Sequence, residues 1–129
     1  MRITKLTDYS LLLLCDMKYG ELISSKNLSN KTKIPFATVN KLLRLLNKGG
    51  ICISKGGKTG GFSLAKKHSE ISMLDIIFCI EGVEIRLTEC AEIDSPCKLK
   101  NFCKISTKMQ AIDNEIYSVL KNKFISDLF

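Results

Sequence analysis

The chain has 129 residues, 45% of them hydrophobic, which is enough for one compact core but too short for two enzyme-sized domains. Its longest unbroken apolar stretch, Leu11 to Cys15, excludes a transmembrane helix of about 20 residues, so we expect a soluble cytoplasmic protein with no membrane partner. The formal net charge of +7 is uneven: residues 1–67 carry thirteen Lys and Arg against three Asp and Glu, whereas residues 68–129 carry seven against ten. A basic first half indicates a module that binds a polyanion, although basic residues also serve merely to solubilise many small domains.

Two helices are predicted at the start of the chain. Thr7 is expected to cap the first helix, which contains four consecutive leucines and stops at Gly20. Ser24 or Ser25 is expected to cap a second, short helix that ends near Lys33, because the proline that follows disfavours helical angles in the residue before it.

A third helix is predicted from Pro35 to Lys48, closed by two glycines. Its apolar residues recur at helical spacing and form one core-facing stripe of Val39, Leu42, Leu43 and Leu46. Its outer face is small, cationic and able to donate hydrogen bonds, as a helix that reads the major groove needs to be; an ordinary amphipathic surface helix has the same pattern. The candidate DNA contacts on this face are Thr38, Asn40, Lys41, Arg44 and Lys48, with Ala37 beside them.

A β-hairpin wing is predicted after the third helix. Residues 51–55 form the outgoing strand, the glycine-rich residues 56–61 the turn, and residues 62–65 the returning strand. Lys55 and Lys58 are expected to contact phosphates or the minor groove. A helix, a tight turn, a helix and a wing together favour a winged-helix DNA-binding unit.

The next helix is short. Ser72 and Asp75 predict its capping box and Gly82 its end. Its expected core contacts are Leu74, Ile77 and Phe78.

A longer helix is predicted from Lys104 onward. Its apolar residues have the spacing of a heptad seam and are Ile105, Met109, Ile112, Ile116 and Val119. The pattern lasts only about two heptads, which predicts a dimer interface supported by the rest of the protein or, equally well, a helix docked on its own domain.

Six cysteines fall into two groups, and in a reducing cytoplasm such clusters more often bind metal than form disulfides. Cys15, Cys52 and Cys79 lie in apolar runs, where cysteine behaves as a small buried hydrophobe. The other three have the spacing C-x6-C-x5-C in a polar stretch, wider than the paired knuckles of zinc sites. Three thiolates fit an iron-sulfur cluster with one labile corner, which a small oxidant or nitric oxide can attack; a thiol switch or an incomplete zinc site remains open. These three are Cys90, Cys97 and Cys103.

Several short motifs carry a resemblance that runs essentially from end to end. They are Leu6-Thr7-Asp8-Tyr9, the Pro35 to Gly50 helix, Gly60-Gly61-Phe62, Asp75-Ile76-Ile77 with Glu81-Gly82, Leu87-Thr88-Glu89-Cys90 and Ile125-Ser126-Asp127-Leu128. In them the chain resembles the Rrf2 family of winged-helix regulators, typified by the iron-sulfur cluster regulator IscR and the nitric-oxide-sensitive repressor NsrR. The Leu-Thr-Glu-Cys start of the cysteine loop favours the branch that regulates iron-sulfur assembly operons.

The resemblance implies a homodimer with crossing C-terminal helices, in which Cys90, Cys97 and Cys103 hold the cluster and its state moves or orders the recognition helix. Some members of the family supply a histidine three residues beyond the third cysteine, but here that residue is Ser106, and the single histidine is His68. Other members use the aspartate of the partner subunit's first helix, which corresponds to Asp8 and favours a four-iron over a two-iron cluster. The reserve ligands are Glu89, Glu92 and Asp94.

The sequence therefore predicts a mainly α fold with a small β-hairpin wing. Four regions are expected: a winged helix-turn-helix (1–67), a connecting helix and extended segment (68–89), a cysteine sensor loop (90–103), and a dimerisation helix with a C-terminal tail (104–129). No nucleophile-base pair or cofactor loop points to an enzyme, so we expect a redox-sensing transcription regulator that binds double-stranded operator DNA. The alternatives are a winged-helix regulator that senses oxidants through bare thiols, and a small electron carrier, which would need neither the basic half nor the wing.

Overall fold

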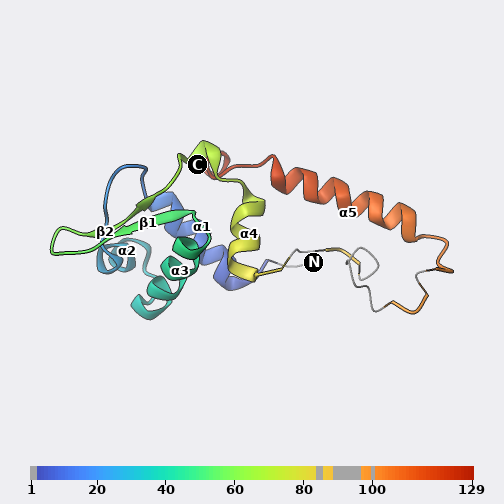
Figure 1. The fold of residues 1–129 in the computed structure, drawn as a ribbon, viewed down its shortest axis with the longest axis horizontal. Helices are drawn as coiled ribbons and strands as arrows, with labels where there is room; N and C mark the ends of the chain where they lie inside the picture. Colours follow the sequence, from blue (N-terminus) through green and yellow to red (C-terminus); the bar gives the residue numbers. More distant parts are fainter. Residues whose placement is uncertain (1–2, 84–85, 89–96, 100) are drawn as a thin grey trace.

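The computed structural model describes residues 3–83, 86–88, 97–99 and 101–129. Figure 1 shows an elongated molecule: a body of helices and a hairpin lies at one end, α4 lies beside it, and α5 projects away as an arm. The described fold is mainly α with one antiparallel hairpin, as predicted. Its elements are α1 (Lys5–Asp16), α2 (Ser25–Thr32), α3 (Phe36–Lys48), β1 (Cys52–Lys55), β2 (Gly61–Leu64), η1 (His68–Glu70), α4 (Met73–Glu81), α5 (Ser106–Lys121) and η3 (Ile125–Leu128), where η denotes a 3-10 helix.

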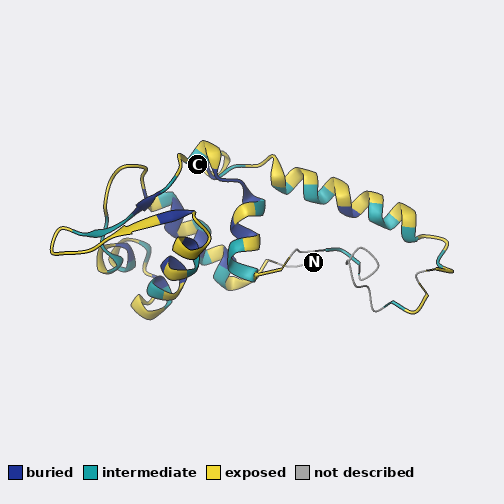
Figure 2. Cartoon of the chain, in the orientation of Figure 1, coloured by how far each residue is buried: buried dark blue, intermediate teal, exposed yellow. Residues whose placement is uncertain are grey.

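The core lies in the body, where the apolar faces of α1, α2 and α3 meet and α4 and η3 close the edges. Full burial of one leucine side chain contributes about 2 kcal/mol, so the apolar stripe of α3 supplies much of the free energy that holds this helix against the body. In Figure 2 the buried residues concentrate in the body, whereas most of α5 is exposed. The predicted α3 stripe of Val39, Leu42, Leu43 and Leu46 is completely buried.

The wing is fastened to the segment that precedes α2. Strands β1 and β2 pair in register from Cys52 with Leu64 to Lys55 with Gly61. Phe62 then exchanges two backbone hydrogen bonds with Ile23, of 2.8 and 2.9 Å. A Cβ at Gly61 would lie 2.5 Å from the Ile23 carbonyl oxygen, so this close approach requires glycine.

The predicted limits of the first helix are wrong at both ends. Thr4, not Thr7, is the N-cap: its side chain accepts a hydrogen bond from the Thr7 backbone N–H at 3.3 Å. Thr7 is buried inside the helix and its hydroxyl donates to Glu81 at 2.6 Å. The helix ends at Asp16, four residues before Gly20.

Helix α4 begins and ends as the sequence predicts. Ser72 and Asp75 form both bonds of the capping box, and Gly82 closes the helix with φ of 73°. The predicted contact of Ile77 is confirmed, since this side chain is buried.

The prediction for the other two α4 contacts is wrong, because Leu74 is only half-buried and Phe78 is 55% exposed. Helix α4 covers the body with one face only. Phe78 lies on its other face and lines a cavity of about 740 Å³ together with Tyr117 of α5.

The C-terminal end of α5 is tied back to the body. Backbone N–H groups donate from Met73 to the Lys123 carbonyl at 2.7 Å and from Ile125 to the Ile71 carbonyl at 3.0 Å. The Ile125 side chain is completely buried, so η3 anchors the chain after α5. Within the described ranges, no helix is long and apolar enough to cross a membrane.

Candidate DNA-binding surface and cysteine segment

The outer face of α3 presents its cations to solvent. Lys41, Arg44 and Lys48 are exposed, whereas Thr38 and Asn40, nearer the core, are half-buried. Because the opposite face is fully buried, α3 is held rigidly while its basic face remains accessible.

The wing carries two further exposed cations. Lys55 ends β1 and Lys58 lies in the turn between the strands. A Cβ at Gly60 would lie 2.1 Å from the Lys55 carbonyl oxygen, so only glycine permits the turn to close this tightly. The glycine-rich turn thus presents Lys58 at the tip of a compact hairpin.

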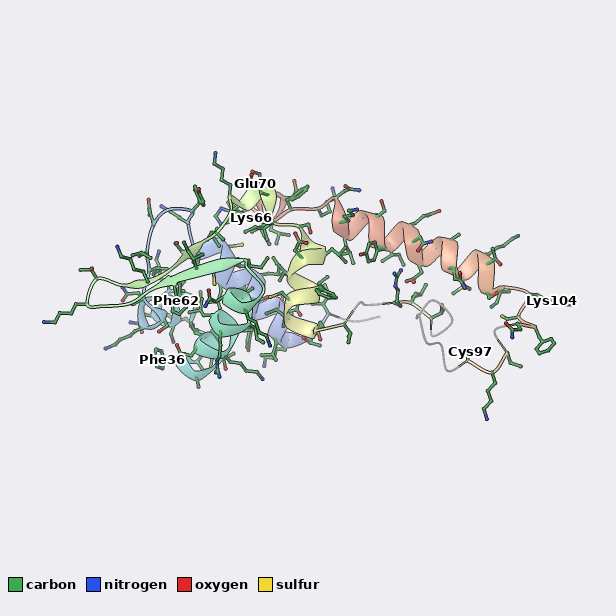
Figure 3. The ribbon with its side chains drawn as sticks, in the orientation of Figure 1. Phe36, Phe62, Lys66, Glu70, Cys97 and Lys104 are labelled. Carbon is green, nitrogen blue, oxygen red and sulfur yellow. The ribbon has the colours of Figure 1, made fainter. Side chains whose placement is uncertain are left out.

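Phe36, the first residue of α3, was missed by sequence reasoning. Its spacing from Val39 and Leu43 fits the core stripe, yet its side chain is 51% exposed. Figure 3 shows it on the outside of the body, at the start of α3. Periodicity gives no signal of this exposure, because it predicts the side of the helix on which a residue lies and not whether another part of the chain covers it.

The cysteine segment, defined as residues 90–103, lies partly outside the described residues. Cys97 and Cys103 are described and half-buried, and Figure 3 places Cys97 and Lys104 at the end of the arm remote from the body. Cys90 and the reserve ligands Glu89, Glu92 and Asp94 lie outside the described residues. Among the described residues, no group of three His, Cys, Asp or Glu side chains is assembled into a metal site.

Asp8 is not brought together with the described cysteines in one chain. It lies exposed in the first turn of α1, in the body, where a carboxylate also stabilises the helix N-terminus. His68 lies at the other end of α1, with its Nε2 2.8 Å from the Leu14 carbonyl oxygen. The single histidine of the chain is therefore engaged in the body rather than near Cys97 or Cys103.

The remaining three cysteines pack into the body. Cys52 is completely buried, and Cys15 and Cys79 are half-buried against the core. Burial raises the pKa of all three thiols, that of Cys52 to about 12 with a smaller contribution from Cys79. The Cys79 thiol also donates to the Leu45 carbonyl at 3.1 Å. These thiols therefore stay protonated near neutral pH, as expected of structural cysteines.

The predicted seam of α5 is only partly covered by the chain itself. Met109 and Ile116 are half-buried. Ile105, Ile112 and Val119 are 62%, 45% and 57% exposed, and they recur at every seventh residue. One apolar stripe of α5 therefore faces solvent in the single chain.

The arm also holds a charged contact that sequence reasoning missed. Asp113 of α5 is only 1% exposed and forms an ion pair with Arg86 at 3.4 Å. Neither residue belongs to a recognisable motif.

Comparison with known proteins identifies relatives along the whole chain. A family profile described as "Rrf2: Iron-dependent Transcriptional regulator" matches residues 3–129. The HTH-type transcriptional repressor NsrR of Streptomyces coelicolor is 26% identical, over 99% of this chain and 88% of its own length. The structure of CymR, the global cysteine regulator of B. subtilis, matches with a TM-score of 0.72 at 22% identity, covering 99% of this chain and 95% of that one. The structure of T. potens IscR matches with a TM-score of 0.65 at 17% identity, covering 99% of this chain and 85% of that one.

Proposed function

Because the chain belongs to the Rrf2 family of DNA-binding transcriptional regulators, we propose that it is a homodimer whose operator affinity is set by an iron-sulfur cluster on Cys90, Cys97 and Cys103. The observation that carries the proposal is the division of the six cysteines. Three are built into the winged-helix core, and the others follow one another in a segment that leads to the remote end of α5.

Charge and exposure support the DNA-binding surface. Arg44 and Lys41 project from α3, where an arginine can donate two hydrogen bonds to a guanine edge, and the wing lysines can neutralise phosphates. The exposed ring of Phe36 at the start of the same helix suits apolar contact with a thymine methyl group. The relatives of the chain are transcriptional regulators rather than enzymes, so we propose no catalytic role for these residues.

The donor chemistry of the cysteine segment fits an iron-sulfur cluster. Iron is bound by thiolate, and burial keeps Cys15, Cys52 and Cys79 in the protonated form. The three cysteines of the segment are then the thiols available as ligands. When bound, the cluster supplies a redox-active iron centre with one exchangeable position, the site where a small oxidant or nitric oxide would act.

Asp8 is proposed as the fourth ligand, contributed by the partner subunit, with a four-iron cluster. Support comes from its exposure in the body, because a carboxylate there is accessible to the arm of a second chain. A carboxylate holds iron less strongly than a thiolate does, which would make this corner of the cluster the exchangeable one.

The exposed stripe of α5 supports the homodimer. Ile105, Ile112 and Val119 leave an apolar seam with heptad spacing in solvent, and a second copy of the helix would bury it. Two winged helices related by a twofold axis would then contact two operator half-sites.

Anaerobic purification tests the cofactor. Bound iron and sulfide with visible absorbance, together with salt-dependent binding to a duplex selected from a random pool, would support the proposal. A colourless protein without iron, whose DNA binding responds to peroxide and is restored by a thiol reductant, would favour the bare-thiol regulator instead. The half-buried Cys97 and Cys103 are the observation that keeps this second function open.

A further inference from the structure

A cavity of about 740 Å³ lies where the end of α3, the length of α4 and one residue of α5 meet. Helix α4 packs against both other helices and lies between the body and the arm (Figure 1). Pockets that bind small organic molecules have volumes of about 300–1,000 Å³, so this cavity has the size of such a site.

The wall of the cavity is closely packed where α4 meets the end of α3. The Cys79 thiol donates to the Leu45 carbonyl at 3.1 Å, and Gly49 permits this approach, because a Cβ there would lie 2.4 Å from the Cys79 sulfur. Two large apolar side chains of the lining remain in contact with solvent, since Phe78 is 55% exposed and Val83 is 64% exposed. A concave site with exposed apolar side chains favours a ligand with an apolar body.

Two lysines give this apolar lining a positive charge. Lys48 is the last residue of α3, and Lys66 follows β2. The Ala65 backbone N–H donates to the Ile51 carbonyl at 3.0 Å and so ties the chain beside Lys66 to the chain that follows α3. Neither lysine forms an ion pair with any residue that the structure describes. Asp75, the one carboxylate among the described lining residues, is already engaged in the capping box of α4. Two unpaired ammonium groups complement an anion.

We propose that this cavity binds a small organic acid with an apolar body. Lys48 and Lys66 hold its carboxylate, and Phe78 with its apolar neighbours covers the rest of the molecule. A carboxylate that leaves water for an apolar site needs cationic partners, which these lysines provide. Aromatic acids and medium-chain aliphatic acids share this chemistry.

The site has a consequence for DNA binding that rests on the proposed function, because Lys48 is also one of the proposed DNA contacts. An acid bound in the cavity engages the ammonium group that would otherwise neutralise a phosphate. Bound acid therefore lowers operator affinity, and by linkage DNA lowers the affinity for the acid by the same factor. The cavity thus adds a second input to the regulator, separate from the cysteines.

The site itself is tested without DNA, by the fluorescence of two probes. Anilinonaphthalene sulfonate is an aromatic anion, and N-phenylnaphthylamine has the same rings without the charge. We expect the anion to bind with a stoichiometry of one per chain. Phe78→Ala should weaken both probes by about tenfold, whereas Lys66→Ala should weaken only the anion, by about threefold. Lys67→Ala is the matched control, because this neighbouring exposed lysine does not line the cavity, and it should leave both affinities unchanged. Circular dichroism verifies folding of each variant.

Two acids then test the ligand class and the link to DNA. Naphthoate and decanoate are titrated against the bound anionic probe, and the stronger competitor assigns the body of the ligand as aromatic or aliphatic. Saturation with that acid, compared with the same concentration of acetate, should lower operator affinity by about threefold or more. The fall of log K with log salt should become less steep by about 0.9 for each occupied cavity, the value of one phosphate contact. Lys48→Ala should remove this response.

Equal losses of the anion in Lys66→Ala and Lys67→Ala would overturn the site, and so would equal probe affinities in the wild type and Phe78→Ala, or displacement by neither acid. A wild type that binds neither probe would overturn it as well; dissociation of a dimer in Phe78→Ala would then assign the cavity to a contact with a second copy. Stoichiometric binding of the acid with unchanged operator affinity would overturn the link through Lys48. A chain that binds the anion in the cavity but binds no duplex would refute the proposed function and leave the site standing.

Discussion

Gly49, the C-cap of α3, lies against the sulfur of Cys79 on α4. A Cβ at Gly49 would come within 2.4 Å of Cys79 Sγ and 3.3 Å of its Cβ. The backbone of Gly49 has φ of −79°, which any residue can adopt. Gly49→Ala is therefore expected to destabilise the protein mainly through the clash with the sulfur, with tight contacts to Cys79 Cβ and to the Leu45 carbonyl oxygen at 3.4 Å beside it.

The cost can be worked from this geometry. Forcing a methyl group into a packed contact costs about 1–3 kcal/mol, and replacing glycine with alanine returns about 0.4–1 kcal/mol through the unfolded state. We expect Gly49→Ala to lower the free energy of unfolding by about 1–2 kcal/mol. In a Cys79→Ala background the tight contacts with the Cβ at 3.3 Å and the Leu45 carbonyl oxygen at 3.4 Å remain and roughly offset the gain through the unfolded state, so the same substitution should cost close to zero. The coupling between the two sites should then be about 1 kcal/mol or more.

Urea unfolding of the wild type, both single variants and the double variant measures this coupling. Gly50 provides the control, because it has φ of +75° and no atom within 4 Å of an added Cβ. Gly50→Ala should cost about 1 kcal/mol through backbone strain, with or without Cys79. If Gly49→Ala costs the same in both backgrounds, the contact between the end of α3 and Cys79 of α4 is not the cause of the destabilisation.

Arg44→Ala should lower operator affinity by about tenfold in gel-shift titrations at fixed salt, because it would remove the base contact proposed for this side chain, whereas Lys121→Ala on α5 should not; equal losses would remove α3 from the proposed interface. If the proposed dimer forms through α5, Ile112→Lys should give a monomer in light scattering, since an unpaired charge in the seam would cost several kcal/mol, and an intact dimer would place the interface elsewhere. Burial raises the pKa of Glu81, but hydrogen bonds from Thr4 and Thr7 lower it by more, so the folded pKa lies below the ordinary 4.5. The ionised Glu81 carboxylate therefore stabilises the folded protein above pH 4.5, and this contribution is lost as the pH falls through the folded pKa. Glu81→Gln should make the melting temperature depend less on pH in the acid range, and an unchanged pH dependence would refute the role of these hydrogen bonds.

The parts of the fold that sequence reasoning predicted correctly depend on local chemistry. Ser72, Asp75 and Gly82 specify both ends of α4 because each acts on backbone groups within four residues of itself. The buried stripe of α3 follows in the same way from helical periodicity alone.

The errors have long-range causes. Thr4 and Thr7 are equally good caps by sequence, and the carboxylate that engages both hydroxyls, Glu81, lies 74 residues beyond Thr7. Asp113 occupies a polar position of the heptad pattern, and its partners lie 26 and 27 residues earlier in the chain. Phe78 has the composition of a core residue but lies on the face of α4 that the body does not cover. Periodicity cannot tell a covered helix face from an uncovered one, because it predicts which side of the helix a residue lies on and not what packs against that side.

Iron and acid-labile sulfide analysis of anaerobically purified protein tests the central claim most directly. The wild type and Cys15→Ser should contain iron and sulfide with visible absorbance, and Cys15→Ser should lose chiefly stability because Cys15 packs against the core. Cys97→Ser and Cys103→Ser should lose most of both elements, since serine is a poor ligand for iron. A wild-type protein without iron and sulfide, or a Cys97→Ser protein that retains the full amount, would contradict the account.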